Sequence, residues 1–272
     1  EGETNCSSET PSAVKMIGAL GGGTTIELDE DGNGTFTDVD GGSGTWDEFF
    51  PIEYFELLVK TPGVIPDGLL SPLSPDQAAF NDVAGRPDGG FYVTQMFPQD
   101  SPMLSILKGA LFGSDTGHVY DWRQTAGWST VPGSEGPFPN GISLAPDGSA
   151  LYINMYLAGE VRKFDLASGR VAAVYEGGNP DNSTWASDGR LLVATHTAAI
   201  ADTTACQGLE SGSCGFAFRI VSLDPDDLSA ETVIEHEGPP MGAATVALEM
   251  DGRLYLGTFA GDRITSLALE SP

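Results

Sequence analysis

Four stretches of the chain repeat one arrangement of apolar and polar positions. In each stretch an apolar run leads into an Asp-Gly turn, and a second apolar run follows the turn; the stretches lie at 80–96, 139–156, 180–196 and 242–259. An Asp-Gly pair between apolar runs is a strong signal for a β-hairpin. The repeat therefore predicts four hairpins and an all-β fold.

The repeated turn also defines one register position in each hairpin. Seven residues before the turn Asp (88, 147, 188 and 251), the chain carries Asn81, Asn140, Asp181 and Ala244. Three of these four equivalent positions have a short side chain that bears oxygen.

Further apolar segments at 117–123, 159–166, 217–224 and 261–269 predict outer strands between and after the hairpins. The register position recurs at intervals of 59, 41 and 63 residues, which suits propeller blades with loop insertions. We expect a six-bladed β-propeller, with five blades as the nearest variant. A β-sandwich is the structural alternative, but it does not predict one register repeated along the chain.

The N-terminal part carries weaker signals. Residues 1–13 are predicted to be a disordered lead, and 14–272 a single propeller domain. Residues 24–38 predict a hairpin around an acidic turn, and 53–60 a strand that leads into a Pro-rich loop. Between 29 and 40 the spacing also matches an EF-hand calcium loop, at Asp29, Asp31, Asn33, Gly34 and Asp40. The flanks are strand-like rather than helical, so the hairpin turn is the favoured interpretation.

Charge narrows the classes of partner. The 272 residues carry 12 Lys and Arg against 39 Asp and Glu, a formal net charge of −27. Such a field disfavours binding to nucleic acid or to anionic membrane surfaces. No apolar run approaches the ~20 residues that span a bilayer. The favoured interpretation is that the excess of acidic residues keeps the protein soluble. The alternative is that it attracts cations.

Cysteine usage bears on the compartment. Cys206 and Cys214 bracket a short polar loop and predict a disulfide in an oxidising environment, with two reduced thiols as the alternative. Cys6 is left over in the N-terminal stretch. Because the chain starts at Glu1 rather than Met, we expect either a processed mature form or an expressed fragment, from which any signal peptide is already gone. The expected location is therefore secreted or periplasmic.

The register position suggests a metal site. Inner strands of a propeller line its central channel, so Asn81, Asn140 and Asp181 should converge at one mouth, with Asn182 beside them. Amide and carboxylate oxygens suit Ca²⁺, which takes 6–8 oxygen ligands. The alternative is that these side chains satisfy hydrogen bonds at strand entry.

One histidine is a candidate for proton transfer. His196 ends the second strand of the third hairpin and should face the same mouth as Asp181. A neutral imidazole beside a metal-bound water suits a general base, whereas the alternative is a rim histidine with a structural hydrogen bond. His118 and His236 are expected on the surface. The sequence has no G-x-S-x-G, P-loop, H-E-x-x-H or zinc-type cysteine motif.

The segments FNDVAGRPDGGFYVT, FPNGISLAPDGSALYINMY, PDNSTWASDGRLLVATH and TVALEMDGRLYLGTFAGDRI resemble the SMP-30/gluconolactonase/paraoxonase-like superfamily. The likeness is nearest to its bacterial paraoxonase-like (arylesterase-like) branch and covers about residues 52–269. It implies a six-bladed propeller with a catalytic Ca²⁺ in the central channel and hydrolysis of lactones or esters. The family's metal-binding positions fall on Asn81, Asn140, Asp181 and Asn182, and its histidine on His196.

The sequence departs from this family pattern at three places. The metal-binding Glu of the first blade has no clear match. Trp46 stands near the position of one paraoxonase histidine, and Gln-Met-Phe follows the strand where a second histidine is expected. Against the family pattern the first blade is therefore expected to be divergent or truncated, and the departures affect the metal site and the residue that transfers the proton.

The favoured hypothesis is a Ca²⁺-dependent hydrolase that acts on a small-molecule lactone or ester. The alternative is a secreted propeller without enzymatic activity, which binds a ligand or protein and holds a structural Ca²⁺. A strictosidine-synthase-like lyase on the same fold is a third hypothesis. The sequence carries no signal for an oligomeric state.

Overall fold

The computed structural model describes residues 79–269, except 99–100, 102–112, 124 and some positions from 200 to 210, together with the backbone of four strands between residues 14 and 46. No α-helix occurs among these residues, so none of them forms an apolar helix that could cross a membrane. The chain divides into two compact units, Glu1–Leu69 and Leu70–Pro272. The predicted lead at 1–13 and the strand at 53–60 lie outside the described residues, and the single domain at 14–272 stays a prediction.

The N-terminal unit contains one antiparallel sheet. Its strands follow in chain order as β1 (Val14–Ile17), β2 (Gly23–Leu28), β3 (Gly34–Thr37) and β4 (Ser43–Trp46). Pairing of β2 with β3 confirms the hairpin predicted at 24–38. Residues 29–33, which include most of the predicted calcium loop, lie outside the described residues.

The C-terminal unit contains four antiparallel sheets, which we call blades 1 to 4. Blade 1 consists of β5 (Ala79–Gly85), β6 (Phe91–Phe97), β7 (His118–Arg123) and β8 (Gly127–Thr130). Blade 2 consists of β9 (Pro139–Leu144), β10 (Ala150–Met155), β11 (Glu160–Asp165) and β12 (Arg170–Glu176). Blade 3 consists of β13 (Asn179–Trp185), β14 (Leu191–His196), β15 (Phe218–Leu223) and β16 (Ala230–His236). Blade 4 has three strands, β17 (Ala244–Met250), β18 (Arg253–Thr258) and β19 (Thr265–Ala268). All four predicted hairpins and all four predicted outer strands are confirmed.

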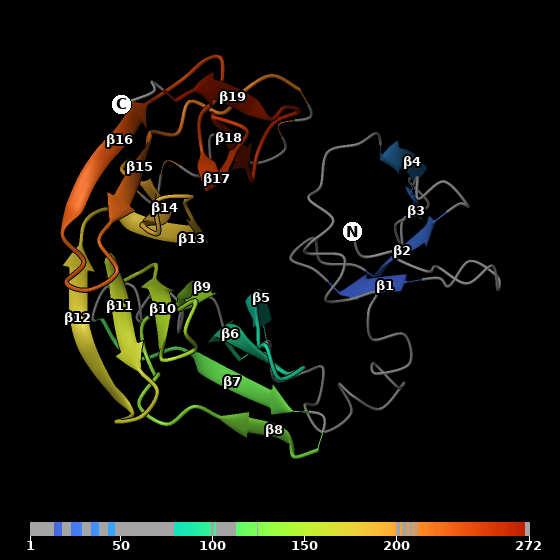
Figure 1. Ribbon diagram of the computed structural model, residues 1–272. Helices are drawn as coiled ribbons and strands as arrows, with labels where there is room; N and C mark the ends of the chain where they lie inside the picture. Colours follow the sequence, from blue (N-terminus) through green and yellow to red (C-terminus); the bar gives the residue numbers. More distant parts are fainter. Residues whose placement is uncertain are drawn as a thin grey trace. The chain divides into compact units, whose positions relative to one another are not determined.

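The arrangement of these sheets is that of a β-propeller. The first strands of the blades, β5, β9, β13 and β17, are neighbours in chain order, and the later strands lie progressively further out (Figure 1). The described residues of this unit form four blades, so the prediction of six is wrong for the part of the chain that the structure shows. Within the described residues the N-terminal unit adds one further sheet, and residues 47–78 lie outside them.

Apolar side chains are buried between neighbouring blades. Leu151 and Ile153 of β10 pack toward blade 1, whereas Tyr152 between them packs toward blade 3. This alternation follows from the two-residue period of a strand. Burial of each such side chain contributes about 1.5–3 kcal/mol, so the joints between blades hold the unit together.

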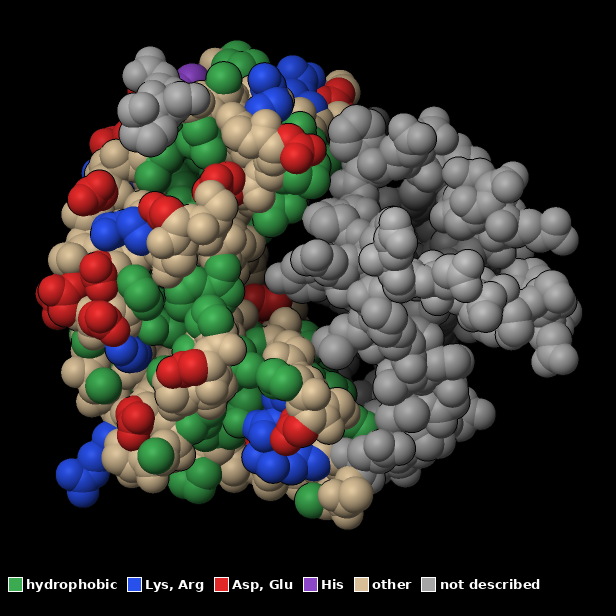
Figure 2. Space-filling view, in the orientation of Figure 1, with side chains coloured by type: hydrophobic (Ala, Val, Ile, Leu, Met, Phe, Trp, Pro, Cys, Tyr) green, Lys and Arg blue, Asp and Glu red, His purple; other side chains and the backbone are tan. Residues whose placement is uncertain are grey.

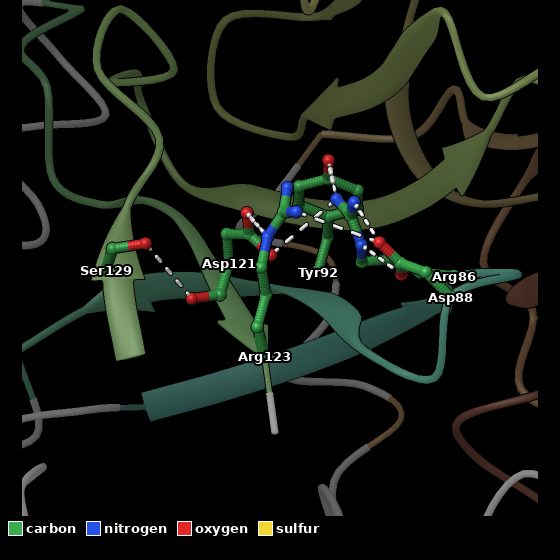
Figure 3. A network of polar contacts seen from close by, with 6 residues as sticks. All are labelled: Arg86, Asp88, Tyr92, Asp121, Arg123 and Ser129. Atoms are coloured by element: carbon green, nitrogen blue, oxygen red, sulfur yellow. Dashed lines mark hydrogen bonds and ion pairs between the residues drawn. The ribbon is translucent and has the colours of Figure 1, made fainter. Parts of the chain in front are cut away.

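A charged network joins the turn of blade 1 to its third strand (Figure 3). Arg86 forms an ion pair with Asp88 at 2.8 Å, and its guanidinium lies 4.7 Å from the centre of the Tyr92 ring. Asp121 of β7 forms ion pairs with Arg86 at 3.7 Å and with Arg123 at 3.0 Å. The network lies at the turn end of the hairpin, away from the register position, and its role is structural.

The acidic side chains of the described residues are scattered on the one face that Figure 2 draws. They lie at several separate places, some of them beside Arg or Lys. This distribution agrees with the solubility interpretation of the net charge.

The disulfide predicted between Cys206 and Cys214 is present, with 5.2 Å between the two Cα atoms. Both cysteines are buried in a cluster with Phe216, Ala243 and Ala260. The bond therefore anchors the loop after β14 to the segments that flank β17 and follow β18.

Replacement of both cysteines, Cys206→Ala with Cys214→Ala, should lower the free energy of unfolding by about 2–3 kcal/mol. A bond that closes a loop of this length restricts the unfolded chain by roughly that amount. Urea denaturation would measure the change, with Cys6→Ala as the control that removes a cysteine and keeps the bond. An unchanged midpoint in the double variant would contradict the expectation.

Candidate metal centre

Every inner strand carries a β-bulge at the same place. One extra residue lies between Phe80 and Val83 in β5, between Pro139 and Ile142 in β9, between Pro180 and Ser183 in β13, and between Ala244 and Val246 in β17. Bulges re-aim side chains and are frequent beside active sites. The register residues Asn81, Asn140 and Asp181 therefore lie within their bulges, whereas Ala244 is paired with Thr258 and directly precedes the bulge residue of β17.

Asp181 is the centre of the candidate site. The Asn182 amide donates a hydrogen bond to Asp181 Oδ1 at 3.0 Å, and the Asn140 side chain donates another to the same carboxylate. His196 Nε2 lies 3.9 Å from Asp181 Oδ2. The structure thus brings together four of the five residues that the sequence singles out.

The fifth residue, Asn81, stands apart. Its Nδ2 donates to Met96 Sδ at 3.3 Å, and within the described part of the chain no recorded hydrogen bond joins it to Asn140, Asp181 or His196. Its place in the predicted ligand set stays a prediction.

His196 is fully buried at the end of β14. Its Nδ1 lies 2.9 Å from the Tyr156 hydroxyl, and the rings of Phe216 and Phe259 contact the imidazole at centroid distances of 5.0 and 5.6 Å. Burial lowers the pKa of His196 to about 4, so the imidazole is neutral at pH 7. The same burial raises the pKa of Tyr156, with the carboxylate of Asp181 adding to the effect, so its hydroxyl stays protonated.

Asp82 is a site residue that the sequence analysis did not single out. Its Oδ2 accepts a hydrogen bond from the Ile142 backbone N–H and its Oδ1 one from the Val83 N–H, each at 2.8 Å. Burial raises the pKa of Asp82 to about 6, although these two donors oppose the rise. The carboxyl therefore links blade 1 to blade 2 close to the register position.

Asp82 and Asp181 together leave negative charge without a partner. Burial raises the pKa of Asp181 to about 7, and the neighbouring Asp82 carboxyl raises it further, against the hydrogen bond from Asn140. Among the described residues, no Lys or Arg side chain forms an ion pair with either carboxyl. The basic side chain recorded beside them is His196, which is neutral. A buried carboxylate in this state favours a cation.

Unpartnered buried oxygens accompany this charge. Asn140 Oδ1 and Asn154 Oδ1 are buried and accept no hydrogen bond. No three His, Cys, Asp or Glu side chains gather as a metal site within the described residues. The candidate donors here are instead the Asp181 carboxylate and amide oxygens, and such hard oxygen donors fit Ca²⁺ rather than zinc.

Asn182 also makes a hydrogen bond that joins two blades. Its Nδ2 donates to the backbone carbonyl of Thr245 at 3.0 Å, in addition to the bond with Asp181. The side chain therefore joins blade 3 to blade 4 beside the candidate site.

Three contributors were missed from sequence: Asp82, Asn154 and Tyr156. Asn154 could have been found from the sequence, because it is the one Asn in the apolar run ALYINM. In the structure every residue of that run is buried. Asp82 was hidden behind its neighbour Asn81 in the strand-entry motif. Tyr156 gave no signal, since an aromatic residue at a strand end is common.

Comparison with known families gives one match. The family model described as the SMP-30/gluconolactonase/LRE-like region matches residues 67–208, slightly more than half of the chain. This range contains Asn81, Asn140, Asp181, Asn182 and His196. Among curated proteins, no sequence matches.

Solved structures match at low sequence identity. A nidogen/laminin complex contains a chain that aligns with a TM-score of 0.51 at 11% identity, over 94% of this chain and 72% of that one. A gluconolactonase from Xanthomonas campestris aligns at 0.43 and 16%, over 91% and 69%. Regucalcin from Agrobacterium tumefaciens, a calcium-binding protein, aligns at 0.39 and 13%, over 90% and 66%. The first of these likenesses supports the fold alone.

Proposed function

The chain belongs to the SMP-30/gluconolactonase/LRE-like family, and on that premise we propose that it is a Ca²⁺-dependent hydrolase of lactones or related esters. The proposed metal ligands are Asn140 and Asp181, with Asn81 and Asn182 completing the set expected from sequence. The substrate is a small molecule with an ester or lactone carbonyl.

One observation carries the proposal. Asp181 is a buried carboxyl beside a second acid, Asp82, and next to it Asn140 Oδ1 accepts no hydrogen bond. Native proteins rarely leave buried charge and buried acceptors unsatisfied. A divalent cation satisfies both at once.

The residues around Asp181 have separable tasks. Asp181 and Asn140 supply oxygen donors, and Asn182 holds the Asp181 carboxylate through Oδ1. When bound, Ca²⁺ supplies a Lewis acid that polarises a carbonyl and stabilises the negative charge that develops on its oxygen. Neutral His196 can accept a proton at Nε2 in the tautomer whose Nδ1–H donates to the Tyr156 hydroxyl oxygen, and this hydrogen bond also fixes the ring. Phe216 and Phe259 shield the imidazole from water.

We also propose that the protein is secreted or periplasmic. The buried disulfide between Cys206 and Cys214 supports this location, because such bonds persist in oxidising compartments.

A panel of aliphatic lactones and an aryl acetate tests the enzymatic proposal. We expect hydrolysis with Ca²⁺, loss of hydrolysis in EGTA and recovery when Ca²⁺ is restored. Asn140→Ala should lose turnover because it removes a ligand oxygen, while its melting temperature in EGTA should stay close to that of the wild-type protein. An Asn140→Ala protein with unchanged activity would contradict the assignment of Asn140 as a ligand of a catalytic Ca²⁺.

A binding propeller with a structural Ca²⁺ is the second candidate. The observation that favours it is the involvement of Asp82 and Asn182 in hydrogen bonds between blades, which ties the site to the joints of the fold. In that case Ca²⁺ would raise the melting temperature while no lactone or ester in the panel is hydrolysed.

A further inference from the structure

The bulges leave two backbone carbonyls in need of a partner. Neither Asn140 nor Asp181 is paired with the second strand of its own blade. Both residues are buried. A buried carbonyl without a hydrogen bond costs about 1–3 kcal/mol, so another group must supply the donor.

In both cases the donor is a side chain of the preceding blade. Thr94 Oγ1 of blade 1 donates to the Asn140 carbonyl at 2.5 Å, and Asn154 Nδ2 of blade 2 donates to the Asp181 carbonyl at 2.7 Å. Thr94 and Asn154 are fully buried. Each hydrogen bond therefore runs across a joint between blades to a residue of the candidate site.

The two donors occupy the same position in their blades. Thr94 follows Val93, the residue paired with Val83, and Asn154 follows Ile153, the residue paired with Ile142. Val83 and Ile142 lie two residues after the register positions Asn81 and Asn140. We call each of these two hydrogen bonds, from Thr94 to Asn140 and from Asn154 to Asp181, a clamp. The same clamp therefore occurs twice in the fold.

Blade 3 lacks this clamp. Its equivalent residue is Ala194, which has no side-chain donor, and the next register residue is Ala244, which has no side-chain oxygen. At the described joints between blades, the clamp is present where the following register residue carries a side-chain oxygen, at Asn140 and Asp181, and absent where that residue is Ala244. The unpaired residue of the β17 bulge is Thr245 rather than Ala244, and its carbonyl accepts a hydrogen bond from Asn182 Nδ2 at 3.0 Å instead.

We propose that Thr94 and Asn154 are positioning residues, which fix the backbone of Asn140 and Asp181 so that their side-chain oxygens converge on the cation. The inference rests on the proposed function, because it assigns these two residues to the proposed Ca²⁺ site. Groups that orient metal ligands typically change metal affinity about 10- to 100-fold when they are removed.

Calcium titration calorimetry on the full chain tests the proposal. Thr94→Val keeps the shape of the side chain and removes the donor, and Asn154→Leu does the same in blade 2. We expect each to bind Ca²⁺ about 10- to 100-fold more weakly. Thr94→Ser, which retains the hydroxyl, should restore the affinity.

Thr184→Val is the matched control. Thr184 Oγ1 donates to the Ala247 carbonyl of the next blade at 2.5 Å, so the variant loses the same kind of hydrogen bond away from the register residues. It should lower the melting temperature in EGTA much as Thr94→Val does, yet bind Ca²⁺ as tightly as the wild-type protein.

The outcomes distinguish the positioning role of Thr94 and Asn154 from the existence of the Ca²⁺ site. Wild-type affinity in both Thr94→Val and Asn154→Leu, or an equal loss of affinity in Thr184→Val, would overturn the positioning role and leave the Ca²⁺ site standing. A wild-type protein that binds no Ca²⁺ would overturn the site itself and the clamp with it. If one clamp variant fails to fold, the variant in the other blade decides.

Discussion

Asp181→Asn should make the metal-free protein more stable and at the same time abolish its response to Ca²⁺. The ordinary pKa of an aspartate is 3.8, and in the folded protein that of Asp181 is raised to about 7. Each pKa unit corresponds to about 1.4 kcal/mol, so ionisation of this carboxyl in the metal-free fold costs a few kcal/mol. The isosteric amide removes that cost and also removes the charge that attracts the cation.

The sign of the pH dependence follows from the same shift. Between about pH 4 and 7 the folded protein holds a proton on Asp181 that the unfolded chain has released, so stability in EGTA falls as pH rises through this window. In Asp181→Asn this slope should be reduced, and the variant should gain most over the wild-type protein near and above pH 7.

Thermal unfolding at pH 5 and pH 7.5, in EGTA and in Ca²⁺, would measure both effects. Asp188→Asn is the matched control, because it makes the same substitution at the exposed turn of the same hairpin. It should leave the Ca²⁺ response intact. A lower melting temperature of Asp181→Asn in EGTA, or a Ca²⁺-induced rise equal to that of the wild-type protein, would show that the carboxyl serves the fold instead.

Gly141→Ala should damage both the fold and the site. A Cβ at this position would collide with the Asp181 carbonyl, and it would lie 2.6 Å from Asn182 Cα and 2.7 Å from Asn154 Nδ2. Two of these neighbours are backbone atoms of the adjacent blade, which cannot move without shifting the bulge. Overpacking of this kind typically costs about 1–3 kcal/mol and sometimes more.

We expect Gly141→Ala to lower the melting temperature and to weaken Ca²⁺ binding beyond the effect of Thr94→Val. Gly215→Ala is the control, since nothing lies within 4 Å of a Cβ added there and its backbone dihedral is ordinary. Unfolding curves and calcium titration would measure the two effects. Wild-type behaviour of Gly141→Ala in both would mean that β9 and β13 approach each other less closely.

The sequence predicted what depends on local pattern. The Asp-Gly turns identify four hairpins, and the count of seven residues back from each turn leads to the bulges of three inner strands and to the residue that precedes the fourth. Both follow from chemistry within one blade. The number of blades did not follow, because the register position recurs only four times and gives no count of blades for the first 80 residues.

The rest of the candidate site depends on contacts between blades. Thr94 lies in an ordinary strand sequence, and nothing local indicates that its hydroxyl meets the Asn140 carbonyl 46 residues later. Asp82 likewise reads as a strand-entry residue until its bond to the Ile142 N–H is seen. Side chains that act across a joint have no fixed spacing in the sequence, so no motif can reveal them.

The clamps also decide where this fold can be recombined. Each pair of clamp and clamped residue spans from the second strand of one blade to the first strand of the next, as in β6 with β9 and β10 with β13. A chimera with its breakpoints between blades would separate every such pair. One with its breakpoints in the Asp-Gly turns would inherit each pair intact, so the module that can be exchanged between relatives is offset by half a hairpin from the blade.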